Sequence, residues 1–526
     1  MRTILHWRAK HDVDEGQENA DRPYYHPGTL DQTAYDRVPY PGHTHARTHP
    51  NRVAAVARLF GVDAPPVGSA RVLEVACGDG ANLIPIAYSL PRAQCAGFDL
   101  AASAVARAQE RIAKLALKNC TITGADLETV GTSLGRFDYV IAHGLYSWVP
   151  RHLRDALLQL IRDTLSPTGI AFVSYNVYPG WHVAGMVRDM LRYHTRAIGN
   201  PATRIEQARA LLGFITAAHD PDDACGRLLA AECERVQKHT PGHLFHDDLA
   251  EVNEPVYFHD FAEHAAAFGL QHLVDADFAS TTGADLPAAA RAKLEELRAD
   301  PIEHGQYLDF VKCRRFRESL LWRAKETVPS SPVAGSVRSL LASSAALSQP
   351  TPVDLAAGVE VQFHWGRRGS LKTDHPLAKA TLVTLHACWP IALSFEELLT
   401  RACRTLGRAA GAQDSSALES ILLSAYGLRM VELTAEPWRA VGAPGNRPRA
   451  SALARLEAEE HDLVTTHGHW QARIDEPLAL RLLRLCDGTR DVTELTAELA
   501  AAGYSTDRAA IARRLEGLAK LALFEE

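Results

Sequence analysis

The sequence has no long hydrophobic run and no excess of positive charge, and each absence excludes a class of protein. No stretch of about eighteen consecutive apolar residues occurs, which is close to the length that a membrane-spanning helix needs. The opening MRTILHWRAKHDVDEGQENADRP is polar and lacks the apolar core of a secretory signal. The formal net charge of -7 argues against nucleic acid as the main partner, because phosphate contacts need a basic surface.

Cysteine is also sparse, and its spacing predicts no cross-links. The nine cysteines are spread over 526 residues without a CxxC pair, which is typical of reduced thiols in a cytoplasmic protein. Hydrophobic residues make up 46% of the chain and charged residues 23%, as in ordinary soluble globular proteins. The length predicts about two to four domains.

From Val72 onward, strand-like and helix-like patterns alternate. The strand patterns are RVLEVA, AQCAGFDL, CTITGADL, FDYVIAHG and IAFVSYNVYPG. A helix is expected over 151–169, ending at Pro167 and Gly169. Strands separated by helices of this length predict an α/β protein with a Rossmann-like, doubly wound sheet. The later segment CRRFRESLLWR alternates polar and apolar residues, as an edge or antiparallel strand does, and we interpret its arginines as a solvated face.

The remaining chain is divided by changes in composition and pattern. The predicted parts are an N-terminal extension (1–50), a sheet-forming domain (51–199), a mainly helical insertion (200–255), the completion of the sheet (256–325), a Ser/Pro/Ala-rich linker (326–374) and two helical, winged-helix-like modules (375–445 and 446–526).

The loop in VLEVACGDGANL, Val72 to Leu83, suits neither common type of phosphate site. It lacks the Lys and hydroxyl of a P-loop, and Leu83 stands where a dinucleotide fingerprint has its third glycine. Glu74 precedes the glycine turn, and its charge repels a phosphate but attracts a cation. S-adenosylmethionine carries a sulfonium, an ammonium and a carboxylate, and the last of these suits the helix N-terminus.

Three further positions follow at the ends of successive strands. Asp99 ends the second strand, where acids accept hydrogen bonds from ribose hydroxyls. Asp126 and the Leu127 backbone follow the third strand and suit an adenine. His143 ends the fourth strand, near the expected methionine arm. An acid at a strand end is often only a cap, but four such positions in order predict a cofactor site.

These motifs resemble those of the class I S-adenosylmethionine-dependent methyltransferases. The longer segments YDRVPYPG, AHGLYSWVP, SYNVYPGWH and EVNEPVYFHDFAEHAAAFGLQ resemble the bacterial methyltransferases with a methyltransferase regulatory domain, a group that includes protein lysine methyltransferases of outer-membrane proteins. The resemblance covers the chain from about residue 35 and implies a lid over the cofactor in 1–50 and a regulatory domain in 200–255. Ala76 replaces the usual first glycine, which we expect to narrow the loop only slightly. The implied cofactor-binding residues are Glu74, Ala76, Gly78, Gly80, Asn82, Asp99, Leu100, Asp126, Leu127 and His143.

The two loops after the fourth and fifth strands supply candidates for catalysis. In-line methyl transfer needs the nucleophile about 3 Å from the methyl group, and an amine must arrive neutral. Aromatic faces attract cations, and hydroxyl or amide oxygens orient an amine. The predicted catalytic residues are Tyr146, Trp148, Tyr175, Asn176, Tyr178 and Trp181. For the aromatic members, the alternative is packing in the core.

The acceptor is predicted to be a lysine of a protein or peptide, presented across the inserted and C-terminal domains. The alternatives are a small-molecule or peptide N- or O-methyltransferase, and a non-catalytic protein that binds S-adenosylmethionine. Nucleobase methylation is disfavoured, because HGLY replaces the usual N/D/S-P-P-Y/F loop. No metal is expected. We interpret His43, His45 and His49 as pocket-lining residues, and we interpret the group of His243, His246 and Asp247 as part of the insertion.

Overall fold

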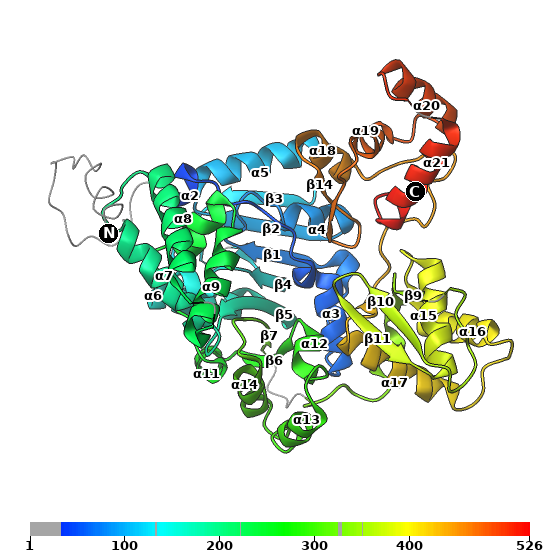
Figure 1. Ribbon diagram of the computed structural model, residues 1–526, viewed down its shortest axis with the longest axis horizontal. Coiled ribbons are helices and arrows are strands. Elements are labelled where there is room, and N and C mark those ends of the chain that lie inside the picture. Colours follow the sequence, from blue (N-terminus) through cyan, green and yellow to red (C-terminus); the bar gives the residue numbers. More distant parts are fainter. Residues whose placement is uncertain (1–32, 132–133, 221, 324–328, 350, 506) are drawn as a thin grey trace.

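The computed structural model describes residues 33–131, 134–220, 222–323, 329–349, 351–505 and 507–526 (Figure 1). Residues 1–32 of the predicted N-terminal extension therefore lie outside the described residues. Within the described ranges, every helix is too short or too polar to cross a lipid bilayer.

A seven-stranded sheet in the order β3-β2-β1-β4-β5-β7-β6 forms the centre of the molecule. Its strands are β1 (Arg71–Val75), β2 (Gln94–Asp99), β3 (Cys120–Gly124), β4 (Phe137–Ala142), β5 (Leu165–Asn176), β6 (Gln271–Asp275) and β7 (Phe316–Trp322). Pairs from β3 to β5 are parallel, while β7 is antiparallel to both neighbours. The predicted doubly wound sheet is confirmed. Its order reverses between β1 and β4, where open α/β sheets bind ligands.

Helices cover both faces of this sheet. One face, called the α4 face, packs on α3 (Pro50–Leu59), α4 (Leu83–Ser89) and α5 (Ala102–Lys114). The other, called the α6 face, packs on α6 (Arg151–Thr164) and α11 (Phe258–Ala267). Successive side chains of a strand point to opposite faces of the sheet. Because helices cover both faces, the inner strands are apolar and buried on both sides.

The helix expected over 151–169 is shorter than predicted. It ends at Thr164, and β5 begins at Leu165. Pairing between β4 and β5 jumps from Phe137–Leu165 to Tyr139–Ile170, so residues 166–169 form an irregular bulge that includes Pro167. A bulge tolerates proline because it needs no ladder hydrogen bond there, whereas the sequence suggested a helix end.

Two helical segments interrupt the last part of the sheet. The first contains α7 (Trp181–Thr195), α8 (Pro201–Ala218), α9 (Ala224–Gln237), α10 (Pro241–His243) and η6 (Leu244–Asp248). The second was not predicted and contains α12 (Phe278–Thr282), α13 (Ala288–Glu295) and α14 (Pro301–Lys312). Figure 1 shows α7 to α9 on the side of the sheet away from the C-terminal modules.

The predicted linker contains strands. These are β8 (Leu341–Ser343), β9 (Leu347–Gln349), β10 (Val361–Trp365) and β11 (Gly369–Thr373). β10 and β11 form a hairpin, and β8 pairs with β12 (Leu393–Ser394) and β13 (Glu432–Thr434) of the following module. The prediction of a linker was wrong here. It relied on the Ser/Pro/Ala composition of the segment and did not use the alternating pattern of VQFHW or the glycines that follow it, which indicate a hairpin.

Two C-terminal modules follow. The first adds η7 (Ser336–Ser339), α15 (Pro376–Cys388), α16 (Phe395–Thr405) and α17 (Asp414–Gly427) to these short strands. The second consists of α18 (Ala452–Glu460), β14 (Leu463–Thr465), β15 (Gln471–Arg473), α19 (Pro477–Leu485), α20 (Val492–Ala501) and α21 (Arg508–Lys520). Its helices enclose a separate apolar core.

Candidate functional site

The glycine loop, residues 76–82, joins β1 to α4 at the carboxyl edge of the sheet. Gly78 and Gly80 have φ angles of 55° and 73°, which glycine adopts readily. A Cβ on Gly80 would lie 2.7 Å from Ile122 Cδ1 and 2.8 Å from Ile84 Cδ1, so any side chain there would displace both isoleucines. Ala76 also has a positive φ of 54°. The expectation that Ala76 only narrows the loop misses this strain, which costs an L-residue about 1 kcal/mol.

Glu74 is the buried acid of the site, with 4% of its surface exposed. Its Oε1 accepts a hydrogen bond from Asn82 Nδ2 at 2.7 Å, while Oε2 is buried without a partner. Burial raises the pKa of Glu74 to about 8; the hydrogen bond from Asn82 opposes the rise, and Asp99 and Asp79 add to it. A buried carboxylate oxygen that lacks a partner fits a cationic ligand group.

Asp99 ends β2 and supports the glycine loop. Its Oδ2 accepts from the Gly78 N–H and its Oδ1 from the Ala101 N–H, both at 2.8 Å. Burial raises the pKa of Asp99, and these two hydrogen bonds oppose the rise. Each oxygen has a further lone pair, so the predicted contact with ribose hydroxyls is compatible with this arrangement.

The predicted adenine site lies one strand further out. Asp126 follows β3, and its Oδ1 accepts from the Glu128 N–H at 2.9 Å. Leu127 is half-buried, and Leu100 is 39% exposed just after Asp99. An exposed leucine beside two acids is suited to cover the flat face of a base. The cofactor roles of these residues stay predictions.

Residues 33–49 cover the glycine loop. A Cβ on Gly42 would lie 2.5 Å from the Cβ of Ala81, so the covering segment touches the loop directly. The short helix α2 (Ala34–Arg37) reaches α5, where Asp36 accepts from the Ser103 N–H at 3.0 Å. The ring of His45 stacks on His143 with centroids 3.5 Å apart. This arrangement supports the predicted lid.

The inserted segment holds this lid from outside. His246 Nε2–H donates to Val38 O at 2.6 Å, and its ring stacks on Tyr35. Tyr40 O–H donates to Asp247 at 3.4 Å. The segment predicted as an insertion is therefore a structural partner of the lid.

The histidines considered as metal ligands point in different directions. His43 stacks on His243, and His45 on His143. His49 is fully buried. Among the residues that the structure describes, no group of three or more His, Cys, Asp or Glu side chains could hold a metal ion.

Beyond Glu74, the side chains of His143, Asn176 and Glu318 form a row across the α4 face. His143 follows the buried Ile141 of that face, and Asn176 of β5 lies opposite Phe316 of β7. Glu318 lies two residues further along β7 and pairs with Arg47 of the lid. Burial lowers the pKa of His143 well below its usual value, so the imidazole is neutral. The sequence analysis did not name Phe316 and Glu318 as candidate site residues, although strand alternation already put them on one face.

Tyr146 and Tyr175 lie on the opposite face, in the core. Tyr146 O–H contacts His264 Nδ1 at 2.8 Å, and Tyr175 O–H contacts Ser319 Oγ at 2.9 Å. Both rings pack on Phe261. Their predicted catalytic role is therefore contradicted by their placement. Tyr175 and Asn176 are neighbours in one strand and so cannot share a face.

The other predicted aromatic residues stay at the carboxyl edge. Trp148 and Trp181 are half-buried and meet edge to face, with centroids 6.2 Å apart. Tyr178 is half-buried and stacks on His182 at 4.1 Å. All three keep part of their surface exposed, and their catalytic roles stay predictions.

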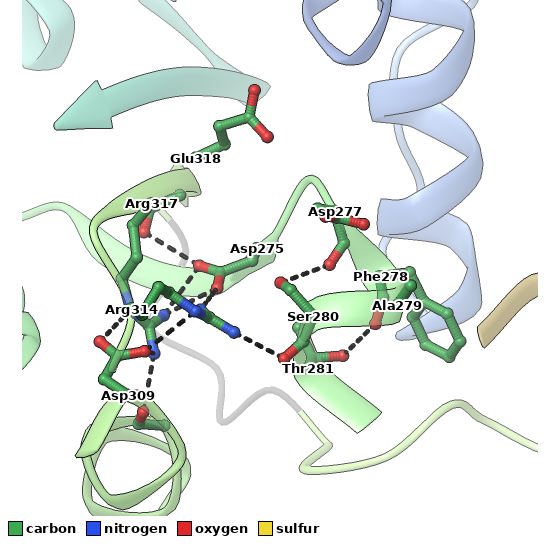
Figure 2. Close-up of polar contacts among 12 residues, drawn as sticks. Asp275, Asp277, Phe278, Ala279, Ser280, Thr281, Asp309, Arg314, Arg317 and Glu318 are labelled. Atoms are coloured by element: carbon green, nitrogen blue, oxygen red, sulfur yellow. Dashed lines mark hydrogen bonds and ion pairs between the residues drawn. The ribbon is translucent and has the colours of Figure 1, made fainter. Parts of the chain in front are cut away.

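The prediction that the arginines of CRRFRESLLWR form a solvated edge is wrong for Arg317, the arginine that lies in β7. β7 lies between β5 and β6, and Arg317 is 3% exposed. Figure 2 shows Arg317 directed at Asp275 and Asp309, while its neighbour Glu318 points away from them. The bonds from Arg317 to the two carboxylates are 2.7–3.1 Å long. Arg317 holds the pKa of Asp275 far below its usual value, despite burial.

Three family models match the chain. They are described as "Methyltransferase domain" over residues 72–169, "Predicted methyltransferase regulatory domain" over 240–323 and "PKMT, C-terminal winged helix domain" over 446–518. The second model overlaps only the end of the predicted insertion (200–255).

Similar proteins occur in Rickettsia. The uncharacterized protein RP789 of Rickettsia prowazekii (strain Madrid E) is 37% identical over 56% of this chain, and the alignment spans 53% of RP789. RP028 of the same strain is 32% identical over 44% of this chain and 93% of RP028. The chain therefore spans about half the length of the first relative. The structure of PKMT2 from Rickettsia typhi superposes with a TM-score of 0.83 at 24% identity, over 92% of this chain and 100% of PKMT2.

The sheet order, the glycine loop and the matched methyltransferase-domain model together define the fold of a class I methyltransferase. Its extra domains narrow the assignment. The chain belongs to the family of methyltransferases that carry a methyltransferase regulatory domain.

Proposed function

We propose that this enzyme transfers methyl groups from S-adenosylmethionine to lysine side-chain amines of a protein substrate. The observation that carries the proposal is the row on the α4 face, which leads from Glu74 through His143 to Asn176 and Glu318. The PKMT winged-helix match over 446–518 and the fold shared with PKMT2 support a protein as the acceptor.

The cofactor end of the row fits S-adenosylmethionine. The unpaired Glu74 Oε2 suits its ammonium, Asp99 its ribose, and Asp126 with Leu127 its adenine. When bound, this cofactor supplies a methyl group whose bond to sulfur breaks as the lysine nitrogen lone pair forms the new N–C bond, and the breaking pair stays on sulfur. The chain has to hold the acceptor nitrogen in line with that bond.

The acceptor end of the row suits an amine. Asn176 Nδ2 donates to Asn253 Oδ1 at 3.2 Å, which leaves the Asn176 carbonyl oxygen to accept from the lysine nitrogen. Desolvation lowers the pKa of an ammonium, so burial beside neutral His143 favours the reactive amine. Glu318 is the carboxylate of the row that accepts the released proton, since burial raises its pKa against the effect of its ion pair with Arg47.

The surroundings of the site suit a polypeptide substrate. Trp148 and Trp181 offer faces for the lysine stem at the carboxyl edge of the sheet. The inserted helices and the C-terminal modules lie on two sides of that sheet (Figure 1) and present the substrate across it. The nine cysteines are free thiols, which supports a cytoplasmic location.

Methyl transfer tests the proposal directly. The full chain is incubated with S-adenosylmethionine and lysine-bearing fragments of bacterial outer-membrane proteins, beside fragments with arginine at each lysine. Intact-mass analysis should show added methyl groups on the lysine fragments alone, and a Glu74→Ala/Asp99→Ala variant should show none. Methylation that persists on the arginine fragments would contradict the lysine assignment.

A further inference from the structure

The turn between β14 and β15 reaches the glycine loop, although 387 residues separate the two in sequence. His469 in this turn is 1% exposed, and its Nε2–H donates to Asn82 Oδ1 at 3.0 Å. The His45 backbone N–H donates to the same oxygen at 2.9 Å, which fixes it as the acceptor. The Asn82 amide nitrogen therefore faces Glu74. The second C-terminal module is thus two hydrogen bonds away from the carboxylate of Glu74.

A stack of alternating indole and guanidinium groups fixes this turn. The stack, called the tryptophan–arginine ladder, consists in order of Trp365, Arg368, Trp470, Arg52 and Trp438. Successive distances from guanidinium carbon to ring centroid are 4.4, 3.9, 4.6 and 5.1 Å. Each contact of this kind is favourable, more so where water is excluded.

The ladder joins three parts of the chain. Arg52 lies on α3 of the methyltransferase domain, Trp365 on β10 of the first C-terminal module, and Trp470 beside β15 of the second. Glu432 bridges the two arginines and accepts from Arg52 Nη2 at 2.8 Å. A change in the position of the second module therefore disturbs Arg52.

Arg52 also clamps the turn and the lid together. Its Nη1 donates to Gly468 O at 2.9 Å and to Ala46 O at 3.2 Å. A cavity of about 270 Å³ lies beside the ladder, so the junction is not closely packed there. The position of His469 rests on these polar and stacking contacts rather than on a filled apolar interface.

We propose that the second C-terminal module is a working part of the cofactor site, with His469 as a positioning residue that acts through Asn82 to hold Glu74. The inference rests on the proposed function in that Glu74 is taken as the ligand of the cofactor ammonium. Without His469, Asn82 Oδ1 loses one of its donors, and the amide is freer to turn away from Glu74. A misplaced Glu74 binds the cofactor less tightly.

Isothermal titration of the full chain with S-adenosylhomocysteine tests this. His469→Ala should weaken binding about tenfold to a hundredfold, the range expected for one lost hydrogen bond in a buried network. His469→Gln restores a donor near the Nε2 position and should bind within about threefold of wild type. His461→Ala, an exposed histidine on the same module, is the matched control and should bind as wild type does.

A double variant separates positioning from a general structural effect. His469→Ala/Asn82→Ala should bind no more weakly than Asn82→Ala alone, because His469 acts only through Asn82. In turnover assays, His469→Ala should raise KM for S-adenosylmethionine and leave KM for the protein substrate unchanged.

Several outcomes would overturn the inference. The inference is wrong if His469→Ala binds S-adenosylhomocysteine as tightly as wild type, or if His469→Gln weakens binding as much as His469→Ala does. It is also wrong if the losses of the two single variants add in the double variant, or if the wild-type chain does not bind S-adenosylhomocysteine. Should His469→Ala fail to fold, the comparison of His469→Gln with wild type and with Asn82→Gln still decides the matter. If the binding results are as expected but the wild-type chain methylates no lysine, the proposed substrate is refuted and the role of His469 is not.

Discussion

Replacing Glu74 with glutamine should change how cofactor affinity depends on pH. The carboxylate is buried, and one of its oxygens has no partner. Because burial raises its pKa to about 8, the group is largely protonated at neutral pH in the empty site. Only the ionised form attracts the cofactor ammonium. Affinity for S-adenosylhomocysteine should therefore rise between pH 6 and pH 8 in wild type and stay flat and low in Glu74→Gln.

The size of the effect follows from the pKa of Glu74. With a pKa of about 8 the ionised fraction is about 1% at pH 6, about 10% at pH 7 and about 50% at pH 8. The dissociation constant should fall about 50-fold over this range. At pH 8, Glu74→Gln should bind about tenfold to a hundredfold more weakly than wild type.

The raised pKa of Glu74 has the opposite effect on the stability of the ligand-free protein, which should fall as the pH rises. The folded pKa lies above the unfolded value of 4.5, so the contribution of Glu74 to stability is complete below pH 4.5 and is lost as the pH rises through 8. At pH 8 the ligand-free Glu74→Gln variant should be more stable than wild type by about 4 kcal/mol, by linkage.

Two measurements on one pair of proteins check both predictions. Titration calorimetry at pH 6, 7 and 8 gives the affinities, and urea unfolding without ligand at the same pH values gives the stabilities. Glu459→Gln, an exposed carboxylate on α18, controls for loss of a charge. An unchanged pH slope in Glu74→Gln, or a wild-type affinity that does not vary with pH, would refute the reasoning.

Three further substitutions test other parts of the structure. Arg317→Met should lower the free energy of unfolding by about 3 kcal/mol, because it leaves two buried carboxylates short of a partner; urea unfolding measures this. Asp99→Ala should weaken S-adenosylhomocysteine binding about tenfold or more by calorimetry, since the Gly78 N–H also loses its acceptor. Asn176→Ala should lower kcat about tenfold or more while Tyr175→Phe leaves kcat within about twofold, so equal losses would contradict the assignment of faces.

The sequence predicted the class of fold because local signals determine it. Strand and helix periodicity located β1 to β5, and the acids at the strand ends fall at the carboxyl edge where the pattern put them. Glu74 was identifiable because an acid before a glycine turn is unusual in a phosphate site. The bulge at Pro167 could not be predicted from the sequence, because a proline after a helical pattern indicates a helix end equally well.

The predictions from sequence were wrong where the structure of a segment depends on residues that are distant in the chain. The β7 segment was interpreted as an edge because nothing local shows that β6 lies beyond it, and burial of Arg317 follows from Asp275 and Asp309. Of the unsuspected strands in 326–374, β8 depends on pairing with β12 and β13, whereas β9, β10 and β11 pair with one another. His469 is the extreme case, since its link to Asn82 exists only in the folded chain.

The contact between His469 and Asn82 has a consequence for how the enzyme matures in the cell. Ribosomes extend a chain by about 5–20 residues per second, so the 387 residues between these two take about 20–80 seconds to follow. The nascent methyltransferase domain spends that time without the hydrogen bond from His469 to Asn82. By the role proposed for His469, tight binding of the cofactor therefore waits until the second C-terminal module has been synthesised and has docked on the methyltransferase domain.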